Sequence, residues 1–401
     1  MPRMPVLLAL FALVISCASA PSAPVGAGVP HGSSASGVAT APDVRVDVVA
    51  AGLEHGWDIG FLPNGSALIT ERPARIKLLS STRPGAQVTE VAADLDDVYV
   101  AGEGGLMGLV VHPDFANTRR FSTCQTHQEG GRPVDVRLIT WELSPDGARA
   151  RRVADPLVAG LTLNPSGRHS GCRPTLGPDG YLYVGTGDSA RGAVSQDRTQ
   201  LGGKVLRIDL HTGAPAPGNP FAGSANAAER LVFTYGNRNV QGVAVQPGTG
   251  RLFITEHGPD VDDEINILQA GANYGWDPSR GGTRGGYNEN VPMTDLQRFP
   301  NAAPAVWSSG RDTQAICGAA FITGQQWGTM QGLLAVAALK GTKLLLMRVD
   351  PNGTVTEVGQ LPQLDGNYGR LRAVRVAGDG ALYVTTSNGD DDKVLRVAPA
   401  S

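Results

Sequence analysis

The chain has little helical periodicity, little cysteine and little net charge. Apolar residues seldom recur at the three- and four-residue spacing of an amphipathic helix, which favours a fold built from strands. The four cysteines in 401 residues allow few cross-links. A formal net charge of −3 argues against nucleic acid or an anionic membrane surface as the main partner. Glycine, in contrast, is abundant at 53 residues, and this fits many turns because 41% of the chain is hydrophobic.

The N-terminus has the pattern of an export signal. Arg3 precedes an apolar run at residues 6–15, which is too short to span a bilayer as a mature helix. Residues 13–17 then resemble a bacterial lipobox, whose cysteine is lipidated and becomes the first residue of the mature chain. We therefore predict a lipoprotein-type signal peptide at residues 1–17 and lipidation of Cys17, which would anchor the protein to a membrane of the cell envelope.

Ordinary secretory cleavage after Ala20 is the alternative. Residues 18–42 are rich in Pro, Ser, Gly and Ala and have no core-forming pattern, so they are predicted to be a flexible tether. Both routes of processing place the protein outside the cytoplasm.

A strand–turn–strand pattern recurs along the rest of the chain. Each copy is an apolar strand, a turn that often contains Pro, Asn or Asp before Gly, and a second β-rich strand. The copies begin at residues 56–65, 105–114, 171–180, 240–247, 316–321 and 371–380. Spacings of roughly 50 to 75 residues fit a four-stranded unit with loops. Residues 43–401 are therefore predicted to form an all-β, six-bladed β-propeller with four-stranded antiparallel blades.

A propeller ring must be closed, and both ends of this segment offer a strand. Residues 43–49 and residues 393–397 each alternate between apolar and polar side chains. Pairing them in the last blade would join the chain ends and cover exposed strand edges.

Three cysteines remain in an oxidising compartment. Cys124 is placed late in the second strand of blade two, and Cys172 opens the first strand of blade three. Adjacent blades can bring the two within bridging distance, so Cys124–Cys172 is the preferred disulfide and Cys317 is left over. The sequence itself leaves all three pairings open.

The residues that open the first strands should converge on one cleft at the mouth of the channel. They are Trp57, Glu103, His169, Arg173, Arg238, Asn239, Gln241, Arg370 and Arg372, with Lys340 within blade five. Several cations confined beside one histidine indicate a multiply anionic ligand. The alternative is that some of them form ordinary salt bridges with Glu103, Glu256 or Asp188.

Residues 257–266 form the densest acidic patch of the chain. Its carboxylates and turn carbonyls are the hard oxygen ligands that Ca²⁺ prefers. The patch lacks the spacing of an EF-hand loop, and a solvated acidic turn is the competing interpretation.

Several motifs carry a family resemblance. Residues 235–242, 255–259, 263–266 and 271–276 resemble the soluble glucose/sorbosone dehydrogenase family, which includes aldose sugar dehydrogenases that use pyrroloquinoline quinone (PQQ). Further matching segments are residues 52–53, 71–73, 102–106, 112–115, 169–171, 203–209, 218–221 and 338–341. The resemblance covers about residues 43–399 in the same motif order.

The resemblance implies a role for each matching residue. His169 would be the catalytic base that takes the proton of the sugar C1 hydroxyl. The PQQ carboxylates and quinone oxygens would be held by Arg238, Asn239, Lys340, Arg370 and Arg372. Glu103 occupies a position that touches substrate in relatives, and Trp57 is assigned to the same substrate side.

The resemblance also implies two metal sites. The main-chain carbonyls of Gly258 and Pro259 would bind the Ca²⁺ that bridges to PQQ and acts as a Lewis acid. Asp263, Glu264 and Tyr274 lie near a second, structural Ca²⁺ in some members of the family.

The sequence departs from the family pattern around the base. Cys172 and Pro174 stand where relatives have small residues and leucine, and Asn237 replaces a histidine. Arg168 precedes the base, where the glucose-oxidising branch has an acidic residue. These departures do not affect the fold, and those at Cys172 and Pro174 favour a binding protein over an enzyme.

The predicted function is PQQ- and Ca²⁺-dependent oxidation of an aldose at C1 to the lactone, outside the cytoplasm, with electrons passed to an extracytoplasmic acceptor. The alternative is a catalytically degenerate propeller lipoprotein that binds a sugar, a cell-wall component or a protein partner. A hydrolase or lactonase propeller is less favoured, because such enzymes typically place carboxylates where this chain has cations.

Overall fold

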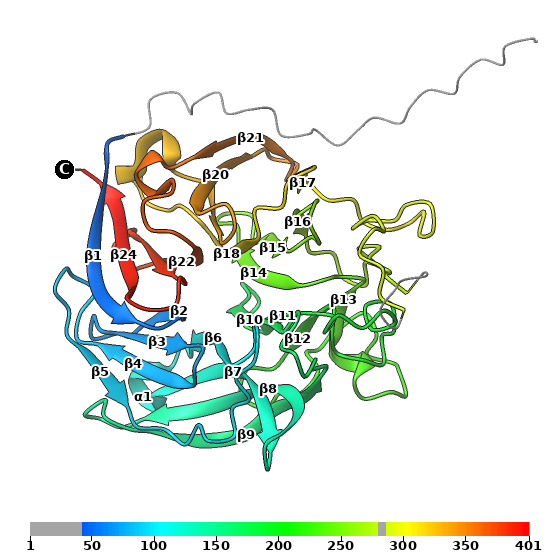
Figure 1. The fold of residues 1–401 in the computed structure, drawn as a ribbon, viewed down its shortest axis with the longest axis horizontal. Coiled ribbons are helices and arrows are strands. Elements are labelled where there is room, and N and C mark those ends of the chain that lie inside the picture. Colours follow the sequence, from blue (N-terminus) through cyan, green and yellow to red (C-terminus); the bar gives the residue numbers. More distant parts are fainter. Residues whose placement is uncertain (1–41, 280–285, 401) are drawn as a thin grey trace, which may run out of the picture.

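The computed structural model describes residues 42–279 and 286–400. Six four-stranded antiparallel sheets surround a central channel (Figure 1). The predicted six-bladed propeller is therefore confirmed. The predicted signal peptide, Cys17 and nearly all of the tether lie outside the described residues.

Five blades are each built from consecutive strands, and the sixth from both ends of the chain. Blade one has β2 (Gly56–Phe61), β3 (Ala67–Glu71), β4 (Arg75–Leu79) and β5 (Val88–Val91); blade two has β6 (Leu106–Val111), β7 (Arg120–Glu129), β8 (Arg132–Leu143) and β9 (Ala150–Leu161); blade three has β10 (Gly171–Leu176), β11 (Leu182–Thr186), β12 (Lys204–Ile208) and β13 (Val232–Tyr235). Blade four has β14 (Val240–Val245), β15 (Leu252–Glu256), β16 (Glu264–Ile267) and β17 (Trp307–Ser308); blade five has β18 (Ile316–Phe321), β19 (Leu334–Ala338), β20 (Lys343–Val349) and β21 (Val355–Gln360); blade six has β22 (Leu371–Val376), β23 (Leu382–Thr386), β24 (Asp392–Pro399) and β1 (Val44–Leu53).

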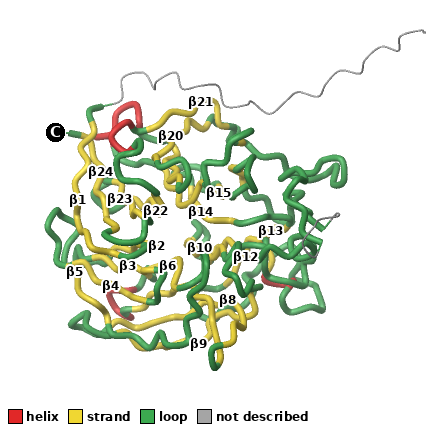
Figure 2. Tube along the Cα trace, in the orientation of Figure 1, coloured by secondary structure: helices red, strands yellow, loops and turns green. Residues whose placement is uncertain are grey.

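Helices are few and short in the described part of the chain, as Figure 2 shows. They are α1 (Phe115–Thr118) and the 3₁₀ segments η1 (Glu229–Leu231), η2 (Gln325–Met330) and η3 (Pro362–Leu364). Among the residues described, no helix is both long enough and apolar enough to cross a membrane.

The ring closes through β1 and β24, as the alternating terminal segments predict. The two strands pair antiparallel, with Val46 opposite Val397 and Val48 opposite Leu395. The C-terminus consequently lies beside β1 (Figure 1). This closure removes a free strand edge that would otherwise be open to pairing with another chain.

The repeated turn has the same physical basis in different blades. In blade three, Asp179 Oδ1 accepts the main-chain N–H of Tyr181 at 3.2 Å, and Gly180 has φ of +80°. In blade six, Asp379 Oδ1 accepts the N–H of residue 381 at 3.0 Å, and Gly380 has φ of +79°. The aspartate closes the turn with its side chain, and glycine supplies the left-handed conformation.

Burial follows from the position of a strand within its blade. The five residues of β3, and likewise those of β11, β15, β19 and β23, are all buried. These second strands have a neighbouring blade on each face, so both sets of alternating side chains enter a core. The stability of each blade therefore depends on its neighbours.

A buried charge cluster joins three blades inside the channel. Asp58 of β2 is 2.7 Å from Arg173 Nη1 of β10, and it accepts two bonds from Arg375 of β22 at 3.0 and 2.7 Å. The Arg173 guanidinium also lies over the ring of Trp57, 4.1 Å from its centroid. Burial opposes ionisation of Asp58, but the two arginines lower its pKa overall. Arg173 thus takes part in an ordinary ion pair, although its partner is not one of the three carboxylates suggested by the sequence.

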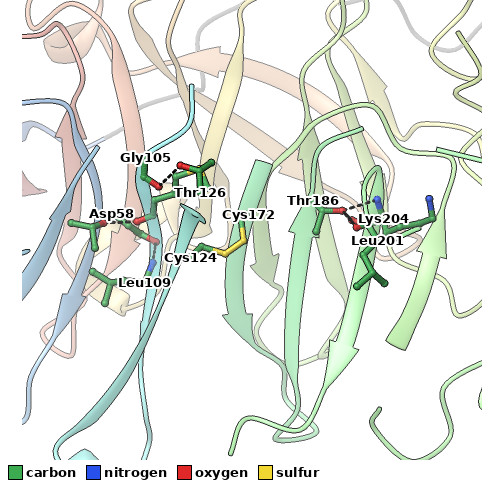
Figure 3. The surroundings of a disulfide bond; sticks show 11 residues. Asp58, Gly105, Leu109, Cys124, Thr126, Cys172, Thr186, Leu201 and Lys204 are labelled. Carbon is green, nitrogen blue, oxygen red and sulfur yellow. Dashed lines mark hydrogen bonds between the residues drawn. A yellow bond between two sulfur atoms is a disulfide. The ribbon is translucent and has the colours of Figure 1, made fainter. Parts of the chain in front are cut away.

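A disulfide joins Cys124 of β7 to Cys172 of β10, with their Cα atoms 6.0 Å apart (Figure 3). It cross-links blades two and three at a sequence separation of 48 residues. Cys317 is a free, buried cysteine. This is the pairing that the sequence favoured among the three that it left open.

Candidate active site

Loops from several blades surround a cleft of about 410 Å³ at one mouth of the channel. Its lining residues are Glu103, His169, Arg238, Asn239, His257, Gly258, Pro259, Asp260, Thr313, Ala315, Lys340 and Arg370. The cleft therefore brings together the predicted base, four of the five predicted PQQ-binding residues, both predicted carbonyl ligands and one predicted substrate residue.

Tight backbone turns place His169 beside Asp188. His169 has φ of +50° and Gly171 has φ of +56°. A Cβ on Gly171 would lie 2.2 Å from the main-chain nitrogen of Gly187, so only glycine permits this approach of the two loops. His169 Nδ1 is consequently 2.7 Å from Asp188 Oδ1. A histidine whose Nδ1–H donates to a carboxylate keeps Nε2 free to accept a proton.

Asp188 is fully buried and accepts several hydrogen bonds. Its Oδ2 accepts the indole N–H of Trp276 and the hydroxyl of Tyr287, both at 2.8 Å. Its Oδ1 also accepts the main-chain N–H of Ala190 at 2.8 Å. Burial opposes ionisation, but His169 and the other partners lower the pKa of Asp188 overall. The carboxylate is therefore charged and held in one orientation.

Glu103 connects the base to the opposite wall of the cleft. Its Oε1 accepts the main-chain N–H of His169 at 3.1 Å, and its Oε2 accepts Asn239 Nδ2 at 3.0 Å. Burial raises the pKa of Glu103, but His169, His257 and these hydrogen bonds lower it overall. A carboxylate is thus held next to the base, where it can accept a hydrogen bond from a ligand hydroxyl.

The side chains of Lys340 and Arg370 in the cleft have no counterion among the residues that the structure describes. Neither lies within 4.0 Å of a carboxylate in the part of the chain that the structure describes, and both residues are exposed. Partial burial of the guanidinium and the nearby Arg372 lower the pKa of Arg370, and Arg72 is affected in the same direction by the same two causes. Like charges gathered without a counterion favour an anionic ligand.

Trp57 and Arg372 lie deeper than their predicted positions and do not line the cleft. Trp57 is 1% exposed, and its ring packs between Arg173 and Arg372, whose guanidinium carbon is 5.5 Å from the ring centroid. Arg372 is 6% exposed, and its Nη1 is 3.7 Å from Cys317 Sγ. Both are therefore buried and in contact with each other.

Main-chain carbonyls form one wall of the cleft. Arg238 Nη1 donates to His257 O at 2.9 Å and to Gly258 O at 2.8 Å. A Cβ on Gly258 would lie 1.9 Å from Val261 O, so this tight loop requires glycine. Asp263 accepts the main-chain N–H of Gly258 at 2.9 Å and fixes the loop from behind. The carbonyls of Gly258 and Pro259 have the oxygen chemistry that suits Ca²⁺.

The three residues predicted near a second, structural Ca²⁺, Asp263, Glu264 and Tyr274, are not among the residues that line the cleft. Both carboxylate oxygens of Asp263 are used within the protein, by Gly258, Thr313 and Gln314. Glu264 is paired opposite Glu256 in the β-sheet register, and burial together with Glu256 raises its pKa to about 8. Tyr274 donates its hydroxyl to Ile267 O.

Sequence reasoning missed several residues that shape the base. Asp188 lies two residues after the end of β11, the second strand of blade three, and the sequence suggested it only as a counterion for a cation. Tyr287 and Glu289 lie in the long connection between β16 and β17, which has no repeat pattern. Glu289 Oε1 accepts Arg238 Nη2 at 2.6 Å and Arg168 Nη2 at 3.0 Å.

Comparison with known proteins gives a consistent result. The sequence model of the family described as glucose/sorbosone dehydrogenase matches residues 53–396. The aldose sugar dehydrogenase YliI of Escherichia coli K12 is 31% identical over 364 residues, which cover 89% of this chain and 93% of the relative. The structure of the PQQ-bound aldose sugar dehydrogenase from Streptomyces coelicolor is 32% identical, with a TM-score of 0.71 over 89% of this chain and 99% of that chain. The apo-form soluble aldose sugar dehydrogenase of E. coli is 30% identical, with a TM-score of 0.78 over 89% of this chain and 100% of that chain. The chain belongs to the glucose/sorbosone dehydrogenase family.

Proposed function

We propose that the protein is a PQQ- and Ca²⁺-dependent dehydrogenase that oxidises an aldose at C1 to the lactone. One observation carries the proposal: a histidine held by a buried aspartate faces a cleft that also contains two cations without a counterion in the described part of the chain. The histidine suits a reaction in which a proton is removed from the substrate, and the two cations suit the binding of an anionic cofactor.

The residues of the cleft fit PQQ, which has several carboxylates. Lys340 and Arg370 are available to them, and Arg238 and Asn239 lie on the adjoining wall. Arginine suits this role because its planar fork pairs with carboxylates and is permanently charged. When bound, PQQ supplies the two-electron acceptor, and a Ca²⁺ held by the carbonyls of Gly258 and Pro259 would polarise the accepting carbonyl.

The protein's part in the reaction is to hold the sugar and remove one proton. His169 Nε2 accepts the proton of the C1 hydroxyl as C1 loses a hydride, so C1 becomes the carbonyl carbon of the lactone. The Asp188 carboxylate, 2.7 Å from Nδ1, stabilises the imidazolium that forms. Glu103 is placed to accept a hydrogen bond from a sugar hydroxyl, and electrons then leave to an extracytoplasmic acceptor.

The cellular setting follows from the N-terminal pattern. We infer lipidation at Cys17 and attachment to a membrane of the cell envelope, with residues 18–42 as the tether. An extracytoplasmic site would give the enzyme direct access to external sugars.

The test combines cofactor binding with turnover. Calorimetric titration of the tether-free protein with PQQ in the presence of Ca²⁺ is expected to show tight binding, and a panel of aldoses should then reduce a redox dye. His169→Ala should abolish turnover and leave PQQ affinity nearly unchanged, whereas His211→Ala, at an exposed histidine, should affect neither. Absence of PQQ binding would overturn the proposal. Binding without turnover on any aldose would favour the alternative of a binding protein.

A further inference from the structure

Tyr287 contacts the aspartate that supports the proposed base. Its hydroxyl donates to Asp188 Oδ2 at 2.8 Å and lies 3.2 Å from His169 Nδ1. Trp276 donates to the same oxygen, so Asp188 uses Oδ1 for His169 and Oδ2 for these two donors. Tyr287 is 8% exposed, and its ring packs against both His169 and Trp276.

The hydroxyl of Tyr287 can act on the base only as a neutral donor. Burial, followed by the charge of Asp188, raises the pKa of Tyr287 far above its ordinary value, so the phenol stays protonated. A hydrogen bond to Oδ2 fixes the plane of the carboxylate and withdraws negative charge from it. Both effects act on the bond between Oδ1 and the imidazole.

Two residues further along the chain, Glu289 ties this segment to both sides of the base. Its Oε1 accepts Arg168 Nη2 at 3.0 Å and Arg238 Nη2 at 2.6 Å. Arg168 directly precedes His169, and its guanidinium carbon lies 5.8 Å from the centroid of the Tyr287 ring. The arginine that departs from the family pattern therefore has a defined contact, and that contact is with the segment that carries Tyr287.

We propose that Tyr287 is a positioning residue for His169, and that the ion pairs of Glu289 with Arg168 and Arg238 hold Tyr287 against Asp188. The inference rests on the proposed function, because it assigns Tyr287 to the base of that reaction. It requires Tyr287 to set the orientation and proton affinity of the His169–Asp188 pair without touching the substrate.

The test is a side-chain NMR titration of His169 in wild type and in Tyr287→Phe. The charged and titratable groups around the His169–Asp188 pair are Tyr287, Glu103, Glu289, Arg168, Arg238, Lys204 and Glu256. Phenylalanine removes only the hydroxyl, which leaves Asp188 more negative and so favours the imidazolium. His169 should then titrate about one pH unit higher than in wild type.

A matched control is Tyr183→Phe. Tyr183 also donates its hydroxyl to an aspartate, Asp179 Oδ2, at 2.9 Å, but at the turn between β10 and β11. The Tyr183→Phe variant should leave the titration of His169 unchanged, although it loses a hydrogen bond comparable to the one lost in Tyr287→Phe. A Tyr287→Phe protein with an unshifted His169 titration would overturn the positioning role, even if its thermal stability fell.

The role of Glu289 is tested by repeating the Tyr287→Phe substitution in a Glu289→Gln background. Loss of the Glu289 charge shifts the titration of His169 equally with or without the Tyr287 hydroxyl, so this contribution cancels in a double-mutant cycle. If Glu289 holds Tyr287 in place, Tyr287→Phe should shift the titration less than half as much in this background. A full shift would overturn the part of the proposal that concerns Glu289.

The titration also separates this inference from the proposed function, because it needs neither cofactor nor turnover. In an active enzyme, Tyr287→Phe should lower kcat about tenfold below the pH at which His169 titrates, with KM and PQQ affinity unchanged. A shifted titration in a protein that oxidises no aldose would support the positioning role and count against the dehydrogenase. Normal aldose oxidation by wild type, with no shift of the His169 titration in Tyr287→Phe, would support the dehydrogenase and overturn the positioning role.

Discussion

The channel and the cleft above it each contain a group of buried or confined charges, and the two groups differ in how they are paired. In the channel, one carboxylate, Asp58, contacts two guanidinium groups, and Leu109 donates a main-chain N–H to it at 3.1 Å. In the cleft, Lys340 and Arg370 line the cavity. Among the described residues, no carboxylate lies within ion-pair distance of either side chain.

The difference separates structural charge from functional charge. Asp58, Arg173 and Arg375 come from three blades, and their mutual contacts replace the water that folding removes. The cleft instead keeps cations that the protein leaves unneutralised, and burial and Arg372 lower the pKa of Arg370. Residue type alone does not distinguish the two groups, since arginine is prominent in both.

The largest effect is expected where the channel cluster is broken. Asp58→Asn leaves Arg173 and Arg375 buried without their common counterion, so the free energy of unfolding should fall by about 3–5 kcal/mol. Urea unfolding measures this. Asp379→Asn is the control, because Asp379 pairs with Arg396 at the surface and is 51% exposed there, so its loss should cost about 1 kcal/mol or less. Equal effects of the two substitutions would show that the channel cluster is not a structural link between blades.

The next effect concerns the base and should appear in turnover rather than in folding. Asp188→Asn removes the charge that stabilises the His169 imidazolium, so kcat should fall about 100- to 1,000-fold. The loss of unfolding free energy should be smaller than for Asp58→Asn, because the partners of Asp188 are one histidine and neutral donors. Steady-state kinetics and urea unfolding on the same protein measure both. A variant that is strongly destabilised but turns over normally would reverse the assignment of the two regions.

Removing a cleft cation should weaken ligand binding without harming the fold. Arg370→Gln should raise the dissociation constant of PQQ by about 10- to 100-fold, as expected for a charged hydrogen bond. The apo protein should be no less stable than wild type, because the substitution relieves repulsion with Arg372. Arg348→Gln, at a surface pair with Glu357 on blade five, is the control and should leave PQQ affinity unchanged. An apo protein destabilised by Arg370→Gln would mean that this cation has a structural partner.

Sequence patterns predict the blades because each copy of the repeat contains its own turn chemistry and strands. They also predict His169 and the unpaired cations, since the start of every first strand faces the same mouth of the channel. They do not indicate how deeply a side chain is buried. Arg370 precedes β22 and lines the cleft, whereas Arg372 is inside that strand, is 6% exposed and lies against Trp57. A shift of two residues along the strand thus separates a cleft residue from a channel residue.

The supporting residues of the base were beyond sequence reasoning for a different reason. Tyr287 and Glu289 lie in the connection between β16 and β17, where no periodicity marks which side chain turns inward. Asp188 carries a local signal, since it lies two residues after the buried strand β11. Its pairing with His169, however, depends on the close approach of Gly171 to Gly187, which is a contact between two loops of the same blade.

The smallest predicted effect lies at the boundary between the two regions and depends on pH. Burial raises the pKa of the Cys317 thiol, but Arg372, His257 and Arg173 lower it to about 7 overall. A depressed pKa stabilises the fold above the pKa of the unfolded thiol, and this stabilisation is lost as the pH falls through 7. Wild type should therefore gain about 1 kcal/mol over Cys317→Ser between pH 6 and pH 8. Urea unfolding at both pH values measures the gain, and thiolate absorbance reports the titration directly. A difference independent of pH would mean that Cys317 stays neutral over this pH range.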